Sequence, residues 1–198
     1  MKPKVKFCGM TREADIEAAE ALAVDFLGFI FVPSSPRYVT LEHAETLKKH
    51  IQKAQLVGVF EEQSQTEMEK HIHMLHLDYV QLYGRQDDGF LKNISVPVIQ
   101  AFRGIPDIKN LESALHHCAY VLIDKAEGEN EVDFDAAAQL PLHIRSKLFF
   151  AGGLTPGNVR VAADRIQPFA VDCARGIESS PGEKNHHRMS AFLHALSS

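Results

Sequence analysis

The chain has 198 residues, of which 45% are hydrophobic and 24% are charged, a composition that excludes a disordered chain and suits one globular domain. The formal net charge of -5 at pH 7 argues against a general nucleic-acid-binding surface but allows a local cationic site for a small anion. The apolar runs are much shorter than a membrane span and no signal-peptide pattern follows the N-terminus, so we expect a soluble, cytoplasmic protein without a membrane partner.

Short apolar runs alternate with helical patterns along the whole chain, which is typical of repeated strand–helix units around a parallel sheet. We predict eight strands, at 5–8, 25–31, 56–60, 79–83, 98–102, 120–124, 148–151 and 169–173. We predict eight helices, at 13–22, 41–51, 65–75, 87–93 (weakly), 108–117, 134–139, 157–166 and 187–196. Candidate helix N-caps are Thr11, Thr40 and Asp107, and Pro156 suits a helix start.

Eight strand–helix units can close into a (β/α)8 barrel, whereas an open doubly wound sheet usually has fewer strands and often a Gly-rich dinucleotide turn, which is absent here. No linker-like tract divides the chain. The prediction is therefore a single compact (β/α)8 TIM barrel over residues 1–198. Because this length is at the lower edge for such barrels, we expect short helices and lean loops.

The three cysteines are odd in number and widely spaced, at Cys8, Cys118 and Cys173. This pattern favours reduced thiols over a disulfide framework or a cysteine zinc site. Three histidines crowd one predicted helix, at His71, His73 and His76. They lack supporting carboxylates or cysteines at ligand spacing, so we interpret them as surface histidines and predict no metal site.

A barrel carries its chemistry at the carboxyl ends of its strands, and Cys8 ends the first strand. Strand alternation places Lys6 and Cys8 inside the barrel, with Val5 and Phe7 facing the helices. A neighbouring ammonium favours the thiolate, which would make Cys8 a usable base or nucleophile. The alternative is that Cys8 is simply a small buried apolar residue.

Asp124 ends the sixth strand, which is otherwise apolar, and its carboxyl group is expected at the barrel mouth. A partly desolvated carboxylic acid there could donate a proton and would pair with Cys8 as acid and base across one cavity. The alternative is a cap or a salt bridge with a nearby lysine such as Lys125. The fourth strand ends in Gln81 and Tyr83, and the eighth contains Asp172.

Glycines follow the seventh and eighth strands, at Gly152, Gly153 and Gly176. These are the loops in which barrels commonly bind phosphate through backbone N–H groups, so we expect a phosphorylated substrate. Ordinary tight turns are the alternative. Arg37 could bind a carboxylate or phosphate through both branches of its guanidinium, or it could be a solvated loop residue.

Four ordered segments carry a resemblance to a known family: KFCGMT at 6–11, GFIF at 28–31 with SPR at 35–37, VQLYG at 80–84, and AGGLTPGNV at 151–159. Together they resemble the phosphoribosylanthranilate isomerases of tryptophan biosynthesis over nearly the whole chain. The resemblance implies a cofactor-free Amadori rearrangement of N-(5-phosphoribosyl)anthranilate to 1-(2-carboxyphenylamino)-1-deoxyribulose 5-phosphate.

The resemblance also implies a role for each site residue. Asp124 would protonate the ring oxygen and Cys8 would remove the C2 proton. Arg37 would orient the substrate, and the loops at Gly152, Gly153 and Gly176 would bind its phosphate. The remaining expected substrate-binding residues are Gln81, Tyr83, Asp172 and Arg175, and the expected assembly is a monomer or homodimer.

The chain departs from this family at three places. Tyr83 stands where a histidine is usual, and Arg175 stands where a small serine is usual. Arg175 could pair with the phosphate or fill its pocket. The acidic segment 127–131 replaces a Gly-rich one, and we expect it to turn outward or to weaken substrate binding.

Two alternatives remain open at this point. One is a non-catalytic barrel that binds a phosphosugar. The other is a different phosphosugar isomerase, such as the aminoaldose isomerase of histidine biosynthesis or a metal-dependent pentose-phosphate epimerase; the resemblance gives these paired aspartates or metal-binding histidines at strand ends, which this chain does not show at those positions.

Overall fold

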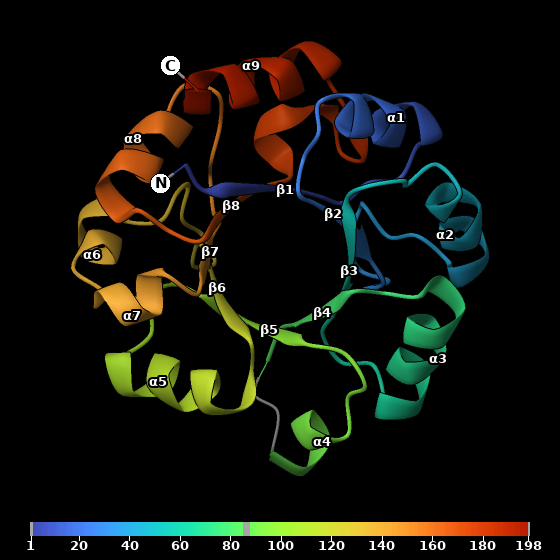
Figure 1. The fold of residues 1–198 in the computed structure, drawn as a ribbon, viewed down its shortest axis with the longest axis horizontal. Helices are drawn as coiled ribbons and strands as arrows, with labels where there is room; N and C mark the ends of the chain where they lie inside the picture. The colour runs from blue at the N-terminus through green and yellow to red at the C-terminus, as the bar shows by residue number, and fades with distance from the viewer. Residues whose placement is uncertain (1, 85–87, 198) are drawn as a thin grey trace.

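The computed structural model, which describes residues 2–84 and 88–197, contains a closed barrel of eight parallel strands in the order β1 to β8. Figure 1 looks down the barrel and shows the helices as a ring around it. The barrel strands are β1 (Lys4–Cys8), β2 (Phe26–Ile30), β3 (Gln55–Phe60), β4 (Tyr79–Leu82), β5 (Val98–Arg103), β6 (Tyr120–Asp124), β7 (Leu148–Phe150) and β8 (Ala170–Cys173). The prediction of a single compact TIM barrel is confirmed.

The helices that follow the strands are short, as expected for a barrel of this length. They are α1 (Glu13–Ala21), α2 (Leu41–Lys48), α3 (Gln65–Leu75), α4 (Asp88–Lys92), α5 (Ile108–His117), α6 (Phe134–Ala138), α7 (Leu142–Arg145), α8 (Val159–Ile166) and α9 (His186–Ser197). A short 3-10 helix, η1 (Arg175–Ile177), and a two-stranded antiparallel hairpin, β9 (Glu178–Ser180) with β10 (Glu183–Lys184), lie between β8 and α9.

Strand alternation divides the apolar residues into two cores. Val121 and Ile123 of β6 belong to the larger core between the strands and the helices, whereas Leu122 belongs to a smaller core inside the barrel. Phe7 faces outward and meets Phe192 of α9 edge to face, with ring centroids 5.8 Å apart. The alternation predicted for β1 and β6 is therefore confirmed.

Aromatic rings fill the interior of the barrel away from the carboxyl ends of the strands. Phe149 is fully buried there, and its ring centroid lies 5.2 Å from that of Phe26 and 5.4 Å from that of Tyr120. Tyr120 stacks on Phe169 at 4.5 Å. This packed layer, the aromatic floor, closes the interior of the barrel beneath its open end. A barrel interior of this kind is filled with side chains and is not a pore.

Several local predictions need correction. The predicted helix 134–139 is followed by a second short helix, α7, and the hairpin after β8 was not predicted. Thr40 caps α2 as expected, with its side chain accepting a hydrogen bond from the His43 N–H. Thr11 does not cap α1; its hydroxyl donates to the carbonyl of Gly182 in the hairpin. Asp87, where the fourth helix was expected to begin, lies outside the described residues.

Two further predicted local features differ. Asp107 occupies the N-cap position of α5 but makes no side-chain cap hydrogen bond. Helix α8 begins at Val159, so Pro156 lies in the turn that precedes it.

The interpretation of three surface histidines is wrong for one of them. His71 is buried, with Nδ1 2.7 Å from the carbonyl oxygen of Glu67 and its ring 4.4 Å from that of Phe31. His73 and His76 are exposed. None of the helices in the described residues combines the length and apolar composition needed to cross a membrane.

The packing of the aromatic floor predicts how a substitution at Phe149 changes the stability of the protein. Phe149→Ala should lower the free energy of unfolding by about 3–5 kcal/mol, because it opens a cavity among packed rings. Urea denaturation measures this loss, and Phe149→Leu, which keeps more of the volume, should cost less. A loss below about 1 kcal/mol for the alanine variant would mean that the floor does not support the barrel.

Candidate active site

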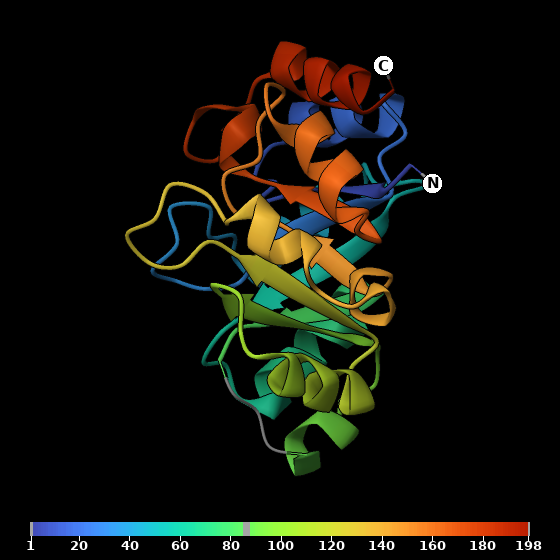
Figure 2. The ribbon, with the colours of Figure 1, turned by 90° about the vertical axis from the view of Figure 1, so that its left-hand side faces the viewer.

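The carboxyl ends of the strands surround a cavity of about 1080 Å³. Figure 2 shows the loops after β2, β6 and β8 projecting from this same end of the barrel. All of the site residues predicted from the sequence line the cavity: Cys8, Arg37, Gln81, Tyr83, Asp124, Gly152, Gly153, Asp172, Arg175 and Gly176. A second hollow, of about 560 Å³, contains none of them and lies against Lys2, Lys4 and α9.

Lys6 and Asp172 form a buried ion pair at the seam where β8 meets β1. The Lys6 Nζ lies 3.0 Å from the Asp172 Oδ2, and the two side chains are 0% and 8% exposed. Lys6 and Asp172 also face each other in the strand register. Burial alone lowers the pKa of Lys6, but Asp172 and Cys8 outweigh that effect, so the pKa is raised and Lys6 keeps its charge.

Cys8 lies beside this pair, in space that Gly28 of β2 leaves open. A Cβ atom at position 28 would lie 2.8 Å from the Cys8 Sγ and 3.3 Å from the Lys6 Nζ. Burial raises the pKa of the Cys8 thiol, and the lowering by Lys6 is smaller. The ammonium thus favours the thiolate, as expected, but desolvation penalises the thiolate more strongly.

Asp124 is held by two donors at the end of β6. The Tyr83 hydroxyl donates to Oδ2 at 3.1 Å, and the backbone N–H of Lys125 donates to Oδ1 at 2.8 Å. The Lys125 ammonium instead donates to the carbonyl of Glu129, so it is not the salt-bridge partner of Asp124.

The ring of Tyr83 also packs against Arg103. The Arg103 guanidinium carbon lies 4.6 Å from the ring centroid, and Arg103 pairs with Glu61 at 2.6 Å. Burial, with a further contribution from Asp124, raises the pKa of Tyr83 well above its usual value. The phenol therefore keeps its proton and remains a donor to Asp124 over the physiological pH range.

Arg37 reaches the cavity but already binds a carboxylate of the chain. Its Nε donates to the Glu178 Oε1 at 2.8 Å, and its Nη2 donates to Oε2 at 2.6 Å. The expectation that both branches of this guanidinium are open to a substrate anion needs correction. The Nη1 group donates to no described residue and is the branch left for a ligand.

Two buried side-chain oxygens have no hydrogen-bond partner among the described residues: the Gln81 Oε1 and the Asp172 Oδ1. Both residues line the cavity. An unsatisfied buried acceptor is costly, so each of these oxygens is a ready acceptor for a hydroxyl of a bound molecule.

The glycines after β7 and β8 allow the surrounding loops to approach closely. Gly153 has a φ of +85°, and a Cβ atom there would lie 2.6 Å from the Asn130 carbonyl oxygen. A Cβ atom at Gly176 would lie 1.9 Å from the Leu154 carbonyl oxygen. The N–H groups of Gly152 and Gly153 donate to no described residue. These loops therefore lie together with bare backbone at the cavity, as an anion site requires.

Arg175 is exposed at the start of η1 and makes no ion pair or side-chain hydrogen bond with any described residue. The acidic segment 127–131 is also exposed, and only Asn130 of this segment lines the cavity. The three glutamates of the segment do not line the cavity, but Glu131 lies beside Gly153 and its Oε2 accepts a hydrogen bond from the Asn158 Nδ2 at 3.3 Å.

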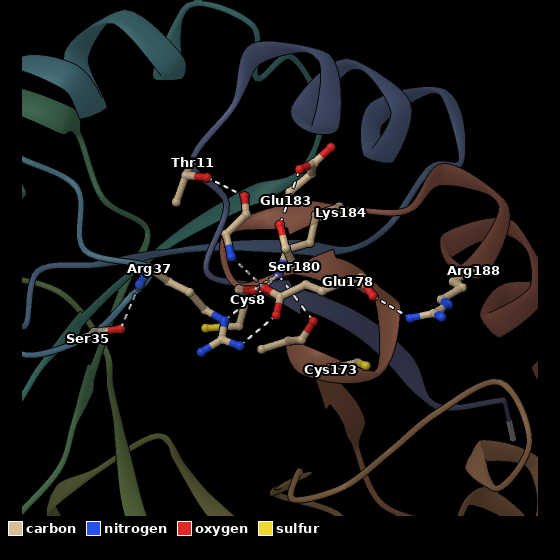
Figure 3. Close-up of polar contacts among 12 residues, drawn as sticks. Cys8, Thr11, Ser35, Arg37, Cys173, Glu178, Ser180, Glu183, Lys184 and Arg188 are labelled. Atoms are coloured by element: carbon tan, nitrogen blue, oxygen red, sulfur yellow. Dashed lines mark hydrogen bonds and ion pairs between the residues drawn. The ribbon is translucent and has the colours of Figure 1, made fainter.

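Sequence reasoning missed two residues of this site, Glu178 and Lys184 of the hairpin. Figure 3 shows the Glu178 carboxylate between Arg37 and the Lys184 ammonium, which lies 2.8 Å from Oε1. Very short strands carry no alternation pattern, so the sequence offered no signal for the hairpin. Within residues 2–84 and 88–197, no group of three or more His, Cys, Asp or Glu side chains is arranged to hold a metal ion.

Comparison with known proteins supports these observations. A family model described as N-(5'phosphoribosyl)anthranilate (PRA) isomerase matches residues 5–195. A relative named N-(5'-phosphoribosyl)anthranilate isomerase, from Maridesulfovibrio salexigens, is 36% identical, and the match covers 97% of both chains.

Solved structures give the same result. One shows monomers of the dimeric phosphoribosylanthranilate isomerase from Thermotoga maritima, at 30% identity, 98% coverage of both chains and a TM-score of 0.83. Another is such an isomerase in complex with reduced 1-(o-carboxyphenylamino)-1-deoxyribulose 5-phosphate, again at 30% identity, 98% coverage of both chains and a TM-score of 0.83. The chain belongs to the N-(5'-phosphoribosyl)anthranilate isomerase family.

Proposed function

We propose that this chain is a phosphoribosylanthranilate isomerase that converts N-(5-phosphoribosyl)anthranilate to 1-(2-carboxyphenylamino)-1-deoxyribulose 5-phosphate in tryptophan biosynthesis. The observation that carries the proposal is the meeting of Cys8 from β1 and Asp124 from β6 in one cavity, which is also lined by Gly152 and Gly153, whose N–H groups donate to no described residue. A carboxylic acid and a thiol in one cavity are the two groups that an acid–base rearrangement of this sugar needs.

The reaction consists of balanced proton transfers. Asp124 donates a proton to the ring oxygen, the bond from that oxygen to C1 breaks, and C1 becomes the carbon of a Schiff base to the anthranilate nitrogen. Cys8 then removes the proton from C2, and its electron pair forms the enolamine. Tautomerisation transfers the C2 hydroxyl proton to C1 and leaves the C2 ketone. The proton on the Cys8 sulfur returns through solvent to the Asp124 carboxylate, which resets both groups.

This sequence oxidises C2 and reduces C1 within one molecule, which makes the reaction an intramolecular aldose–ketose oxidoreduction. No external electron acceptor enters the balance, so we propose that the enzyme needs no cofactor. Lys6 lies beside the sulfur and would stabilise the thiolate that acts as base, because its ammonium offsets part of the desolvation cost.

The remaining site residues bind and orient the substrate. The free Nη1 branch of Arg37 suits the anthranilate carboxylate, and the unpaired oxygens of Gln81 and Asp172 suit the sugar hydroxyls. The phosphate would lie at Gly152, Gly153 and Gly176, where Arg175 adds a positive charge. Tyr83 lines the same cavity and keeps Asp124 oriented.

We further propose that residues 1–198 act as one isomerase domain in the cytoplasm, as a monomer or a homodimer. The dimeric relative of known structure, also solved as monomers, supports both assembly states. The alternative is a barrel that binds a phosphosugar without catalysis. The first experiment below distinguishes this alternative from the isomerase.

The two proton-transfer residues give the most direct test. Cys8→Ala and Asp124→Asn should each lower kcat by about 100-fold or more, because a general acid or base contributes 10² to 10⁴ in rate. The loss of anthranilate fluorescence on freshly generated substrate measures turnover. Unchanged turnover in either variant would remove that residue from the mechanism, and no turnover by the folded unmodified protein would favour a binding-only barrel.

The raised pKa of Cys8 predicts the direction of a pH dependence. The mechanism needs a deprotonated Cys8 and a protonated Asp124, so the Asp124→Asn variant isolates the titration of Cys8. In that variant a raised pKa leaves a small thiolate fraction near neutrality, and the residual kcat/KM should rise several-fold between about pH 7 and about pH 9 in the same fluorescence assay. A kcat/KM that falls over this interval would exclude the Cys8 thiolate as the base.

Arg175 tests the phosphate site. Because this arginine is exposed and unpaired beside Gly176, it should pair with the phosphate, and Arg175→Ser should raise KM about 10-fold with little change in kcat. Arg160, on the outer face of α8 and paired with Asp164, provides a control for the loss of one surface charge. A lower KM in Arg175→Ser would show instead that the side chain obstructs the phosphate.

A further inference from the structure

The hairpin of β9 and β10 lies directly beside the cavity, and its polar side chains are buried. Glu178 and Lys184 are 3% and 0% exposed at their side chains, although they belong to strands of only three and two residues. Buried charges are expensive unless they are paired and hydrogen-bonded, so a hairpin that only closed the chain between β8 and α9 would not need them.

Glu178 is the centre of a set of contacts among distant parts of the chain. Its carboxylate accepts two hydrogen bonds from Arg37 and one from the Lys184 Nζ, and its Oε1 also accepts from the Gly182 N–H at 3.3 Å. Burial raises the pKa of Glu178, but Arg37 and Lys184 together lower it below its usual value. Glu178 therefore stays ionised and holds the guanidinium through two parallel hydrogen bonds.

Lys184 connects the same carboxylate to the ends of two barrel strands. Its Nζ donates to the Cys8 carbonyl oxygen at 2.6 Å and contacts the Ala174 carbonyl oxygen at 3.3 Å. Its backbone N–H donates to the Asp15 Oδ2 at 3.0 Å, which attaches the hairpin to α1. Figure 3 shows Lys184 and Glu178 next to Cys8 and Arg37. One ammonium thus fixes the backbone at the catalytic cysteine.

These contacts have two consequences for a substrate anion. Arg37 is held in one orientation before any ligand arrives, so binding does not have to order a long, flexible side chain. In addition, Glu178 pairs with two cations, Arg37 and Lys184, so its single negative charge does not offset both of them. The Nη1 branch of Arg37 is left to bind a ligand.

We propose that Glu178 and Lys184 are positioning residues: the hairpin orients Arg37 for the substrate carboxylate through Glu178 and fixes the backbone of Cys8 through Lys184. This inference rests on the proposed function, because it takes the carboxylate as the anion that Arg37 receives. It predicts that Glu178 affects binding only through Arg37.

A double-mutant cycle tests that dependence. Arg37→Ala, Glu178→Gln and the double variant are compared with the unmodified protein by titration calorimetry with the reduced 1-(o-carboxyphenylamino)-1-deoxyribulose 5-phosphate. We expect Glu178→Gln to raise Kd about 10-fold in the unmodified background and less than about twofold in the Arg37→Ala background. An equal rise in both backgrounds would overturn the proposal, since Glu178 would then act independently of Arg37.

Glu183→Gln is the matched control. Glu183 lies on the same hairpin and pairs with Arg12 at 2.8 Å, but both side chains are about half exposed and neither lines the cavity. Its Kd should change by less than about twofold. A 10-fold rise in this control would show that binding responds to any weakening of the hairpin, which would also overturn the proposal.

Lys184→Met provides a test if Glu178→Gln does not fold, because it leaves Glu178 paired with Arg37. We expect kcat to fall at least about fivefold while Kd for the reduced analogue rises less than about threefold. The reason is that the variant mainly loses the hydrogen bond from the Lys184 Nζ to the Cys8 carbonyl oxygen. Unchanged kcat would overturn the role of Lys184. If the unmodified protein neither turned over substrate nor bound the analogue, the proposed function would fail instead.

Discussion

The ion pair between Lys6 and Asp172 lies where the last barrel strand pairs with the first, and both side chains point into the barrel. A lysine and an aspartate buried at such a seam require each other, because either charge alone would be left uncompensated in the interior. The same pair forms the wall against which Cys8 lies. One interaction therefore lies both in the β1–β8 ladder that closes the barrel and in the environment of the proposed base.

Much of the barrel could be predicted from the sequence because its signals are local. Alternation within a strand decides which side chains face inward, and this was enough to place Cys8 and Asp124 correctly at the open end. The helices after β6 were harder to predict, because α6 and α7 together contain few residues and show no long apolar period. The hairpin carries no periodic signal at all.

The site could be predicted as a set of residues but not as a set of contacts. Arg37 and Glu178 are separated by 141 positions, and Tyr83 and Asp124 by 41, so no local pattern relates them. The ionisation of Cys8 shows the same limit: the nearby ammonium was visible in the sequence, whereas the burial that outweighs it depends on the packed interior. Residue types and their positions at strand ends predict which side chains lie at the cavity. Three-dimensional packing decides the hydrogen-bond partners and the ionisation of each side chain.

The seam between β1 and β8 also has a consequence for the time course of folding. Residues needed for the proposed chemistry come from both ends of the chain, from Cys8 to Lys184, and β8 is synthesised after all other barrel strands. Contacts of such large sequence separation form late, because a long loop must close before they contribute. The appearance of activity during refolding would therefore report the final closure of the ring, after the secondary structure has already formed.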